Sequence, residues 1–288
     1  MKNCRLLIFI MMFLAFSGCE GGMLPSYDPQ IVVEGWIEND GYPVVILTTT
    51  VPVNDSVQDS TALKDYIIRW GKVTVSDGEK EVVLAGRKDD RYFPPYIYTT
   101  SRIKGEVGKE YHLRVEYSGR TVTAVTSIPE PAPLEYVRMH EVTDKEIQAD
   151  LKRYQLIGGL KDKKDRKDYY KVFTKVQNQD STFVSSFLGL TDDAVLSDAI
   201  EEIPINRGFG QLDGKNDPYF KSNDIVHIRF CTLTQDGWEY WSDFEEIQSL
   251  TQNPFFPITT DIRSNIKGGL GYWTGYGSNY YTLEINPL

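Results

Sequence analysis

The chain has 288 residues, of which 41% are hydrophobic and 25% are charged, a composition typical of a globular protein with a sizeable core rather than of a disordered chain. Its formal net charge is −10, and it becomes −12 once the basic residues Lys2 and Arg5 are removed with the leader described below. Such an acidic chain is poorly suited to nucleic acid or to an anionic membrane surface held by charge alone. With only three cysteines, a disulfide framework and a cysteine-rich zinc site are excluded.

The first segment, residues 1–18, has the pattern of a secretory signal peptide. A basic tip precedes the apolar run Leu6–Phe16, and the small residues Ser17 and Gly18 close it. The run is too short for a membrane-spanning helix, which needs roughly 20 apolar residues. We therefore expect residues 1–18 to be removed.

Cys19 follows the small pair directly, in an arrangement similar to a bacterial lipobox. We expect Cys19 to become the acylated N-terminus, with residues 19–27 as a flexible leash to the folded part. A plain secretory signal with an incidental cysteine is the alternative.

Residues 28–128 carry β-strand patterns almost throughout. Asp77-Gly78, between the runs Lys72–Ser76 and Glu79–Leu84, is a strong hairpin signal, and Ser118-Gly119 indicates a second hairpin. These features predict an N-terminal immunoglobulin-like antiparallel β-sandwich.

Three prolines within residues 129–133 predict an extended linker, followed by a second β-rich domain over residues 134–288 with one or two short helices. The expected helices are a short one over Ala194–Ile200 and an amphipathic one over 237–252, where apolar residues recur every three or four positions. The expected strands of this domain are Leu134–Val142, Tyr154–Leu160, Tyr169–Val176, Ile225–Leu233 and a final one around Thr282–Ile285.

The stretch Gly268–Gly277 combines glycines with Tyr272, Trp273 and Tyr276. One interpretation is a bend or bulge in a sheet, packed by aromatic side chains. The other is an aromatic surface that contacts a ligand or a protein partner, because Tyr and Trp offer broad faces with a polar tip. The sequence favours the core interpretation and leaves the second open.

The sequence contains no recognisable catalytic motif, and we predict no catalytic residues, no metal site and no cofactor. His112, His140 and His227 lie on separate predicted strands, without the close spacing of zinc ligands. Cys231 lies inside an apolar strand pattern, which predicts a buried thiol rather than a nucleophile.

Several short motifs together resemble a Bacteroidota family of outer-membrane lipoproteins that carries domain of unknown function 4249. The resemblance implies an accessory partner of an outer-membrane TonB-dependent transporter, often encoded beside it. The motifs that carry it are Val33-Glu34-Gly35, Tyr169-Tyr170, Asn253-Pro254-Phe255, Ser264-Asn265-Ile266 and Gly268-Gly269-Leu270-Gly271.

The sequence therefore predicts a lipid-anchored outer-membrane accessory or ligand-binding protein, not an enzyme, that works with a TonB-dependent transporter. A structural or adhesive surface β-sandwich module is the main alternative, because fold does not decide function. The identity of the small-molecule ligand, and the choice between the periplasmic and cell-surface faces of the membrane, remain open at this stage.

Overall fold

The computed structural model describes residues 28–52, 62–142, 152–161, 167–192, 200–208, 217–251 and 262–286. Cys19, the signal peptide and the leash lie outside these residues, as does the helix expected over Ala194–Ile200 apart from its last residue. Within the described residues the chain is mainly β, as predicted, and its strands form three sheets.

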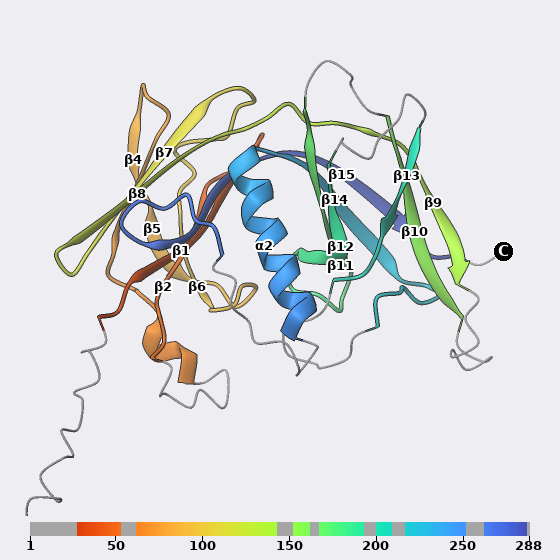
Figure 1. Cartoon of the computed structure of the whole chain (residues 1–288), viewed down its shortest axis with the longest axis horizontal. Coiled ribbons are helices and arrows are strands. Elements are labelled where there is room, and N and C mark those ends of the chain that lie inside the picture. Colours follow the sequence, from red (N-terminus) through yellow and green to blue (C-terminus); the bar gives the residue numbers. More distant parts are fainter. Residues whose placement is uncertain are drawn as a thin grey trace, which may run out of the picture.

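The largest sheet has eight strands, and the two smaller sheets have three and four. In spatial order, the large sheet comprises β12 (Val184–Asp192), β11 (Tyr169–Val176), β14 (Ile225–Leu233), β15 (Leu270–Glu284), β1 (Ile31–Glu38), β2 (Val44–Thr49), β6 (Tyr96–Thr99) and β5 (Ala85–Lys88). The three-stranded sheet comprises β13 (Glu201–Ile205), β10 (Arg153–Leu160) and β9 (Leu134–Val142). The four-stranded sheet comprises β4 (Glu81–Val83), β3 (Lys72–Ser76), β7 (Glu110–Tyr117) and β8 (Arg120–Ser127). A 3-10 helix, η1 (Ala62–Tyr66), and the α-helix α2 (Gln235–Thr251) complete the described elements (Figure 1).

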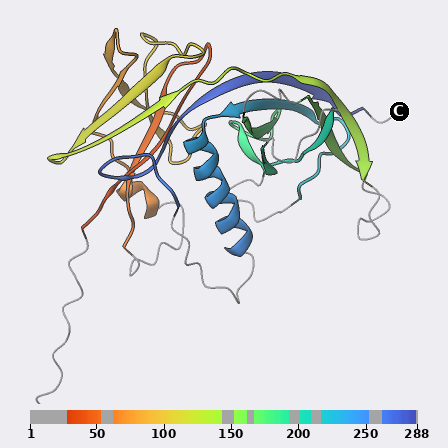
Figure 2. The ribbon, with the colours of Figure 1, turned by 45° about the horizontal axis from the view of Figure 1, so that its top comes forward.

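Strand β15 joins the two halves of the large sheet. Its first half, up to Tyr276, pairs in parallel with β1, and its second half, from Tyr276 to Glu284, pairs antiparallel with β14. Figure 2 shows this long strand passing from the N-terminal strands into the strands that follow the linker. The end of the chain therefore completes a sheet that the beginning of the chain started.

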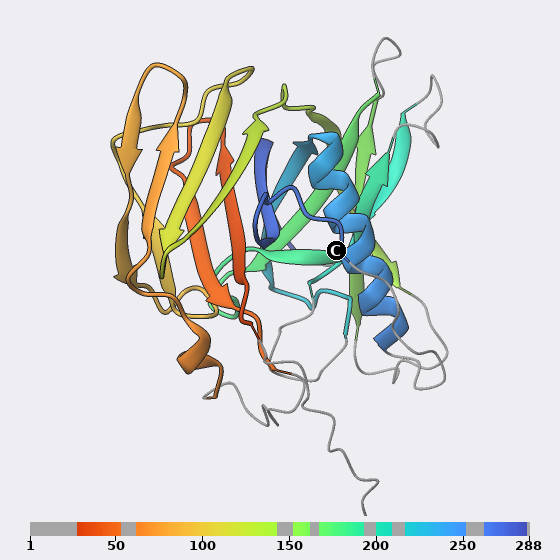
Figure 3. The ribbon, with the colours of Figure 1, turned by 60° about the vertical axis from the view of Figure 1, so that its left-hand side comes forward.

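The two faces of β15 have different neighbours, because successive side chains of a strand point to opposite faces. Trp273 enters a core with Val33 of β1 and with strands of the four-stranded sheet. Further along, Leu283 packs against a second core shared with the three-stranded sheet. The opposite face presents Tyr272 and Tyr276 to a third cluster that includes residues of α2. Figure 3 shows the yellow and orange strands of the four-stranded sheet on one side of β1 and the helix on the other.

The end of β8 and the proline-rich linker that follows it cross β15 where the strand has glycines. A Cβ at Gly275 would lie 2.1 Å from the backbone oxygen of Ser127, and a Cβ at Gly277 would lie 2.3 Å from that of Pro129. Only glycine lets the two backbones approach this closely. Because the large sheet takes strands from both sides of the linker, the division into domains at residues 129–133 remains a prediction, as does the immunoglobulin-like classification.

Several expected elements are confirmed with small changes of boundary. The hairpins at Asp77-Gly78 and Ser118-Gly119 are β3–β4 and β7–β8. The amphipathic helix is α2, which begins at Gln235 and ends at Thr251. The final strand is much longer than expected, because it begins at Leu270 and includes most of the glycine-rich stretch. Gly268 and Gly271 have positive φ angles, 84° and 97°. In the stretch Gly268–Gly277, where a bend or bulge was expected, these left-handed residues lie at the start of the strand.

Candidate functional site

A cavity of about 660 Å³ lies beside the face of the large sheet that carries Tyr272 and Tyr276. Strands β1, β11, β14 and β15 contribute side chains to it, and α2 contributes another wall. The remaining lining comes from β2, from η1 and the chain just after it, from the β5–β6 connection, and from β12 with the segment that leads into it. Aromatic lining residues are Trp36, Tyr92, Phe93, Phe173, Phe183, Phe187, Tyr240, Trp241, Phe244, Tyr272 and Tyr276. The size and the aromatic lining are those of a site for a small organic ligand.

The aromatic rings form a connected wall between α2 and β15. The ring of Tyr240 lies 4.2 Å from that of Tyr272, and Trp241 lies 5.8 Å from Tyr272. On the other side, Trp36 of β1 lies 6.0 Å from Tyr92. Aromatic side chains bury large areas with few rotatable bonds, so this wall presents a stiff apolar surface.

Arg229 of β14 is the buried cation of the cavity. Its guanidinium carbon lies 4.3 Å from the ring centre of Phe173, 5.2 Å from that of Phe183 and 5.3 Å from that of Tyr276. Its Nη1 lies 3.7 Å from Oε2 of Glu38, which is an ion pair but longer than a hydrogen bond. The Nε atom is buried without a hydrogen-bond partner. The ring contacts stabilise the charge, but the donor capacity of the group is not used up.

Glu34 of β1 is an acidic group at another part of the lining. Its Oε1 accepts a hydrogen bond from the hydroxyl of Tyr272 over 3.2 Å. Desolvation by the surrounding protein raises the pKa of Glu34 to about 7, and the Tyr272 hydrogen bond opposes this increase. The side chain is nevertheless exposed, because the carboxyl borders the open volume of the cavity. Glu34 is thus surrounded by protein and still accessible to a ligand.

Helix α2 is held over the cavity by polar contacts at several points. Trp241 Nε1 donates a hydrogen bond to the Tyr276 hydroxyl over 3.1 Å. The ammonium of Lys171, which is fully buried on β11, is hydrogen-bonded to Glu245 of the helix and lies 5.0 Å from the ring centre of Trp241. These contacts fix the helical wall against the sheet.

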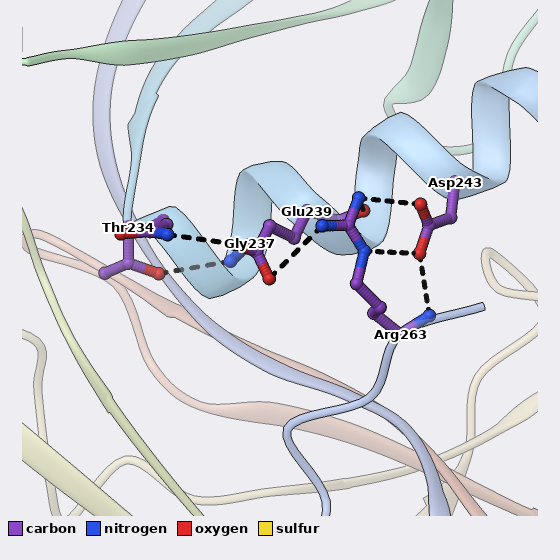
Figure 4. Close-up of polar contacts among 6 residues, drawn as sticks. Thr234, Gly237, Glu239, Asp243 and Arg263 are labelled. Atoms are coloured by element: carbon purple, nitrogen blue, oxygen red, sulfur yellow. Dashed lines mark hydrogen bonds and ion pairs between the residues drawn. The ribbon is translucent and has the colours of Figure 1, made fainter.

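A second set of contacts ties α2 to the segment that leads into β15 (Figure 4). Arg263 makes a two-pronged contact with Asp243, with Nε–Oδ2 and Nη2–Oδ1 distances of 2.9 and 2.7 Å. Its Nη1 also lies 3.4 Å from Glu239. At the start of the helix, the backbone N–H of Gly237 donates to the Thr234 hydroxyl over 3.3 Å, which caps one of the free amides. Helix α2 is therefore held both by the sheet and by the segment that precedes β15.

The three aromatic residues singled out in the sequence separate onto two faces. Tyr272 and Tyr276 line the cavity, although only 5% and 1% of their surfaces are exposed. Trp273 points the other way, is completely buried, and donates from Nε1 to the backbone oxygen of Tyr111. Trp273 is thus a core residue and offers no surface to a partner, whereas a binding role for the two tyrosines remains a prediction.

Sequence reasoning did not identify Arg229 and Glu34 as site residues. The signal for Arg229 was a charged residue in the middle of the mostly apolar run Ile225–Leu233, and Lys171 lies in a similar position in Tyr169–Val176. A charge within a strand buried on both faces needs a specific partner. Glu34 gave less signal, because it alternates with apolar residues as an ordinary solvent-facing residue would.

The three histidines lie in three different sheets, and Cys231 lies in the protein core. His112, His140 and His227 lie on β7, β9 and β14, one in each of the three sheets. Within the described ranges, no group of three or more His, Cys, Asp or Glu residues is placed to hold a metal ion. Cys231 is fully buried as expected, and burial raises the pKa of its thiol to about 11.

The fold and the site define a mainly β protein with a helix-covered aromatic cavity on one face of its central sheet. The model of the family Domain of unknown function (DUF4249) matches residues 23–281, and the chain belongs to this family. None of the curated proteins compared with the chain matches it. No helix in the described part of the chain is both long and apolar enough to cross a membrane.

Proposed function

We propose that this protein is a lipid-anchored outer-membrane accessory protein of Bacteroidota that binds a small ligand and works with a TonB-dependent transporter. The observation that carries the binding role is the aromatic cavity of about 660 Å³ with its buried arginine. The anchoring role rests on the leader and on Cys19, and the partnership rests on the resemblance of the motifs.

Binding fits the cavity better than catalysis does. Acid–base or nucleophilic chemistry requires an activated group in contact with another functional group. The lining carboxyl with a raised pKa, that of Glu34, accepts its hydrogen bond from Tyr272, whose own pKa is raised well above its usual value by burial, so this phenol stays protonated. Most of the lining residues are apolar, and eleven of them are aromatic, which favours the capture of an apolar body over bond breaking.

A lipid anchor would make the partnership effective at modest affinity. Acyl chains on Cys19 would hold the protein in the membrane plane, where the local concentration of a membrane neighbour is high. The proposal holds for the periplasmic and for the cell-surface face of the membrane alike.

The experiment compares wild type with Cys19→Ala, expressed from the native gene with its neighbours. Wild type should fractionate with membranes and incorporate labelled fatty acid, and mild detergent should co-purify a TonB-dependent transporter. Cys19→Ala should lose the label, the membrane fraction and most of the transporter. Acyl labelling of Cys19→Ala would remove the anchor, and wild type that captures no transporter would remove the accessory role.

A further inference from the structure

Glu34 lies on the sheet side of the cavity, and its neighbours on the sheet are apolar or aromatic. The register of the large sheet places Tyr272 of β15 beside Glu34 on one side and Ile46 of β2 on the other. Trp36 lies on the same face of β1, because side chains two residues apart in a strand point the same way. All four side chains line the cavity. The carboxyl is therefore an isolated acidic group on an apolar surface.

Two aromatic residues near this carboxyl keep part of their surface free. Trp36 and Tyr240 are half-buried, and both line the cavity. The ring of Tyr240 lies 4.2 Å from that of Tyr272, the residue that donates a hydrogen bond to Glu34. Burial, and after it the nearby charge of Glu34, raises the pKa of the Tyr240 hydroxyl. The faces of aromatic rings attract cations, so the rings and the carboxylate favour the same kind of ligand group.

The other carboxylates of the lining already contact cations. Asp90 lies 2.8 Å from the ammonium of Lys88. Asp180 lies 3.4 Å from the guanidinium of Arg207. Glu34 is exposed, and among the described residues it makes no ion pair. A ligand cation would therefore find its partner at Glu34.

The cations of the lining do not neutralise this carboxyl. Arg91 and Arg229 each lie beside another acidic residue, at 2.6 and 3.7 Å. Lys64 lies on η1 and is exposed to solvent. Burial and a tyrosine hydrogen bond, rather than a neighbouring cation, set the pKa of Glu34, so Lys64 does not act as its partner.

The surroundings of Glu34 suit a cation that needs few hydrogen bonds. Its Oε1 already accepts a hydrogen bond from Tyr272 over 3.2 Å, and the adjacent lining groups are aromatic rings and the aliphatic Ile46. A primary ammonium carries three N–H donors, each of which needs an acceptor when it is buried. An ammonium that carries alkyl groups instead offers its charge to the carboxylate and its apolar surface to the rings.

We propose that the cavity binds a small organic cation with an alkylated ammonium group, which contacts the carboxylate of Glu34 and the rings of Trp36 and Tyr240. This inference rests on the ligand-binding role proposed above and specifies the chemical class of the ligand. Ion pairing and ring contact act on the same group, so a neutral molecule of the same shape binds more weakly.

Calorimetric titration of the folded mature protein with 4-(hydroxymethyl)phenyltrimethylammonium and with 4-tert-butylbenzyl alcohol tests the proposal. The two probes have the same shape, and only the first carries a charge, which does not titrate. At pH 8, above the pKa of about 7 of Glu34, the cation should bind roughly 10- to 100-fold more tightly than the alcohol. This comparison needs no protein variant, so it holds whether or not a variant folds.

Three variants assign the preference to one carboxylate. Glu34→Gln should bind the two probes with equal affinity. Asp90→Asn is a matched control, because it removes a lining carboxylate that already contacts Lys88, and it should keep the preference for the cation. Lys64→Gln should also keep the preference, since it removes only an exposed cation. Circular dichroism and melting curves check that the variants fold.

Wild type that binds the two probes equally, or that binds neither at millimolar concentration, overturns the inference. A preference that survives in Glu34→Gln and is lost in Asp90→Asn overturns it as well. The neutral apolar probe N-phenyl-1-naphthylamine separates these failures from a failure of the proposed function. If this probe binds and the cation is not preferred, only the ammonium ligand is removed, whereas binding of no probe removes the ligand-binding role as well.

Discussion

The substitution Trp241→Ala tests whether α2 is a structural wall of the cavity. Trp241 is 7% exposed, contacts the rings of Phe173 and Phe244 at 5.5 Å, and donates a hydrogen bond to Tyr276. Removing a buried large aromatic side chain costs about 3–5 kcal/mol, mainly through lost burial and the cavity left behind. The Tyr276 hydroxyl would lose its partner in a buried site, which adds about 1 kcal/mol. The expected loss of unfolding free energy is therefore about 4–6 kcal/mol.

Urea unfolding followed by circular dichroism measures this loss, and two further variants bracket it. Trp241→Phe keeps most of the ring contacts and should cost about 1–2 kcal/mol, chiefly through the hydrogen bond to Tyr276. Trp70→Ala is a matched control, because Trp70 is 88% exposed and should change stability by less than about 0.5 kcal/mol. If Trp241→Ala unfolds at the same urea concentration as Trp70→Ala, the helix is not docked as described and the cavity loses a wall.

Three other substitutions test separate features of the account. Because the folded-state pKa of Glu34 is raised from 4.5 to about 7, ionisation of this carboxyl destabilises the fold progressively between these pH values. The melting temperature of Glu34→Gln should therefore rise relative to that of wild type from pH 5 to pH 8. A difference in melting temperature that stays constant over this range would contradict the raised pKa. Gly275→Ala should cost more than about 1 kcal/mol in urea unfolding, since the new Cβ would meet the Ser127 oxygen. A neutral result would mean that the end of β8 does not cross β15 there. Lys171→Met should lower the free energy of unfolding by about 3 kcal/mol, because it leaves Glu245 unpaired. The double variant Lys171→Met, Glu245→Leu should recover most of this loss. A double variant as unstable as the single one would argue against the ion pair.

Local elements of the fold were predictable from the sequence because their signals are local. A two-residue turn such as Asp77-Gly78 fixes its own hairpin, and the three- to four-residue spacing of Trp238, Trp241 and Phe244 fixes the buried side of α2. The predicted boundaries of the strands Leu134–Val142 and Ile225–Leu233 are those of β9 and β14, because long apolar or alternating runs are strong signals for a strand.

The cavity was not predictable, because it depends on pairing between distant parts of the chain. Glu34 and Tyr272 come together only when β15 returns to lie beside β1, and the sequence carries no local signal for that register. The same pairing decides the fate of the aromatic tail. Trp273 is opposite Gly35, where a Cβ would lie 2.9 Å from its ring, so the indole fills the space of the missing side chain and is buried. Tyr272 and Tyr276, on the opposite face of the strand, line the cavity instead.

The binding of N-phenyl-1-naphthylamine to the mature protein tests the central claim, that the aromatic cavity accepts a ligand, most directly. Trp36 lines the cavity and Trp70 does not, so Trp36→Ala and Trp70→Ala remove the same side chain inside and outside the site. The account predicts saturable fluorescence enhancement with wild type, unchanged affinity for Trp70→Ala, and binding weakened roughly tenfold for Trp36→Ala through the loss of about 1–2 kcal/mol of aromatic contact. Equal affinities for all three proteins, or no saturable binding to wild type, would contradict it.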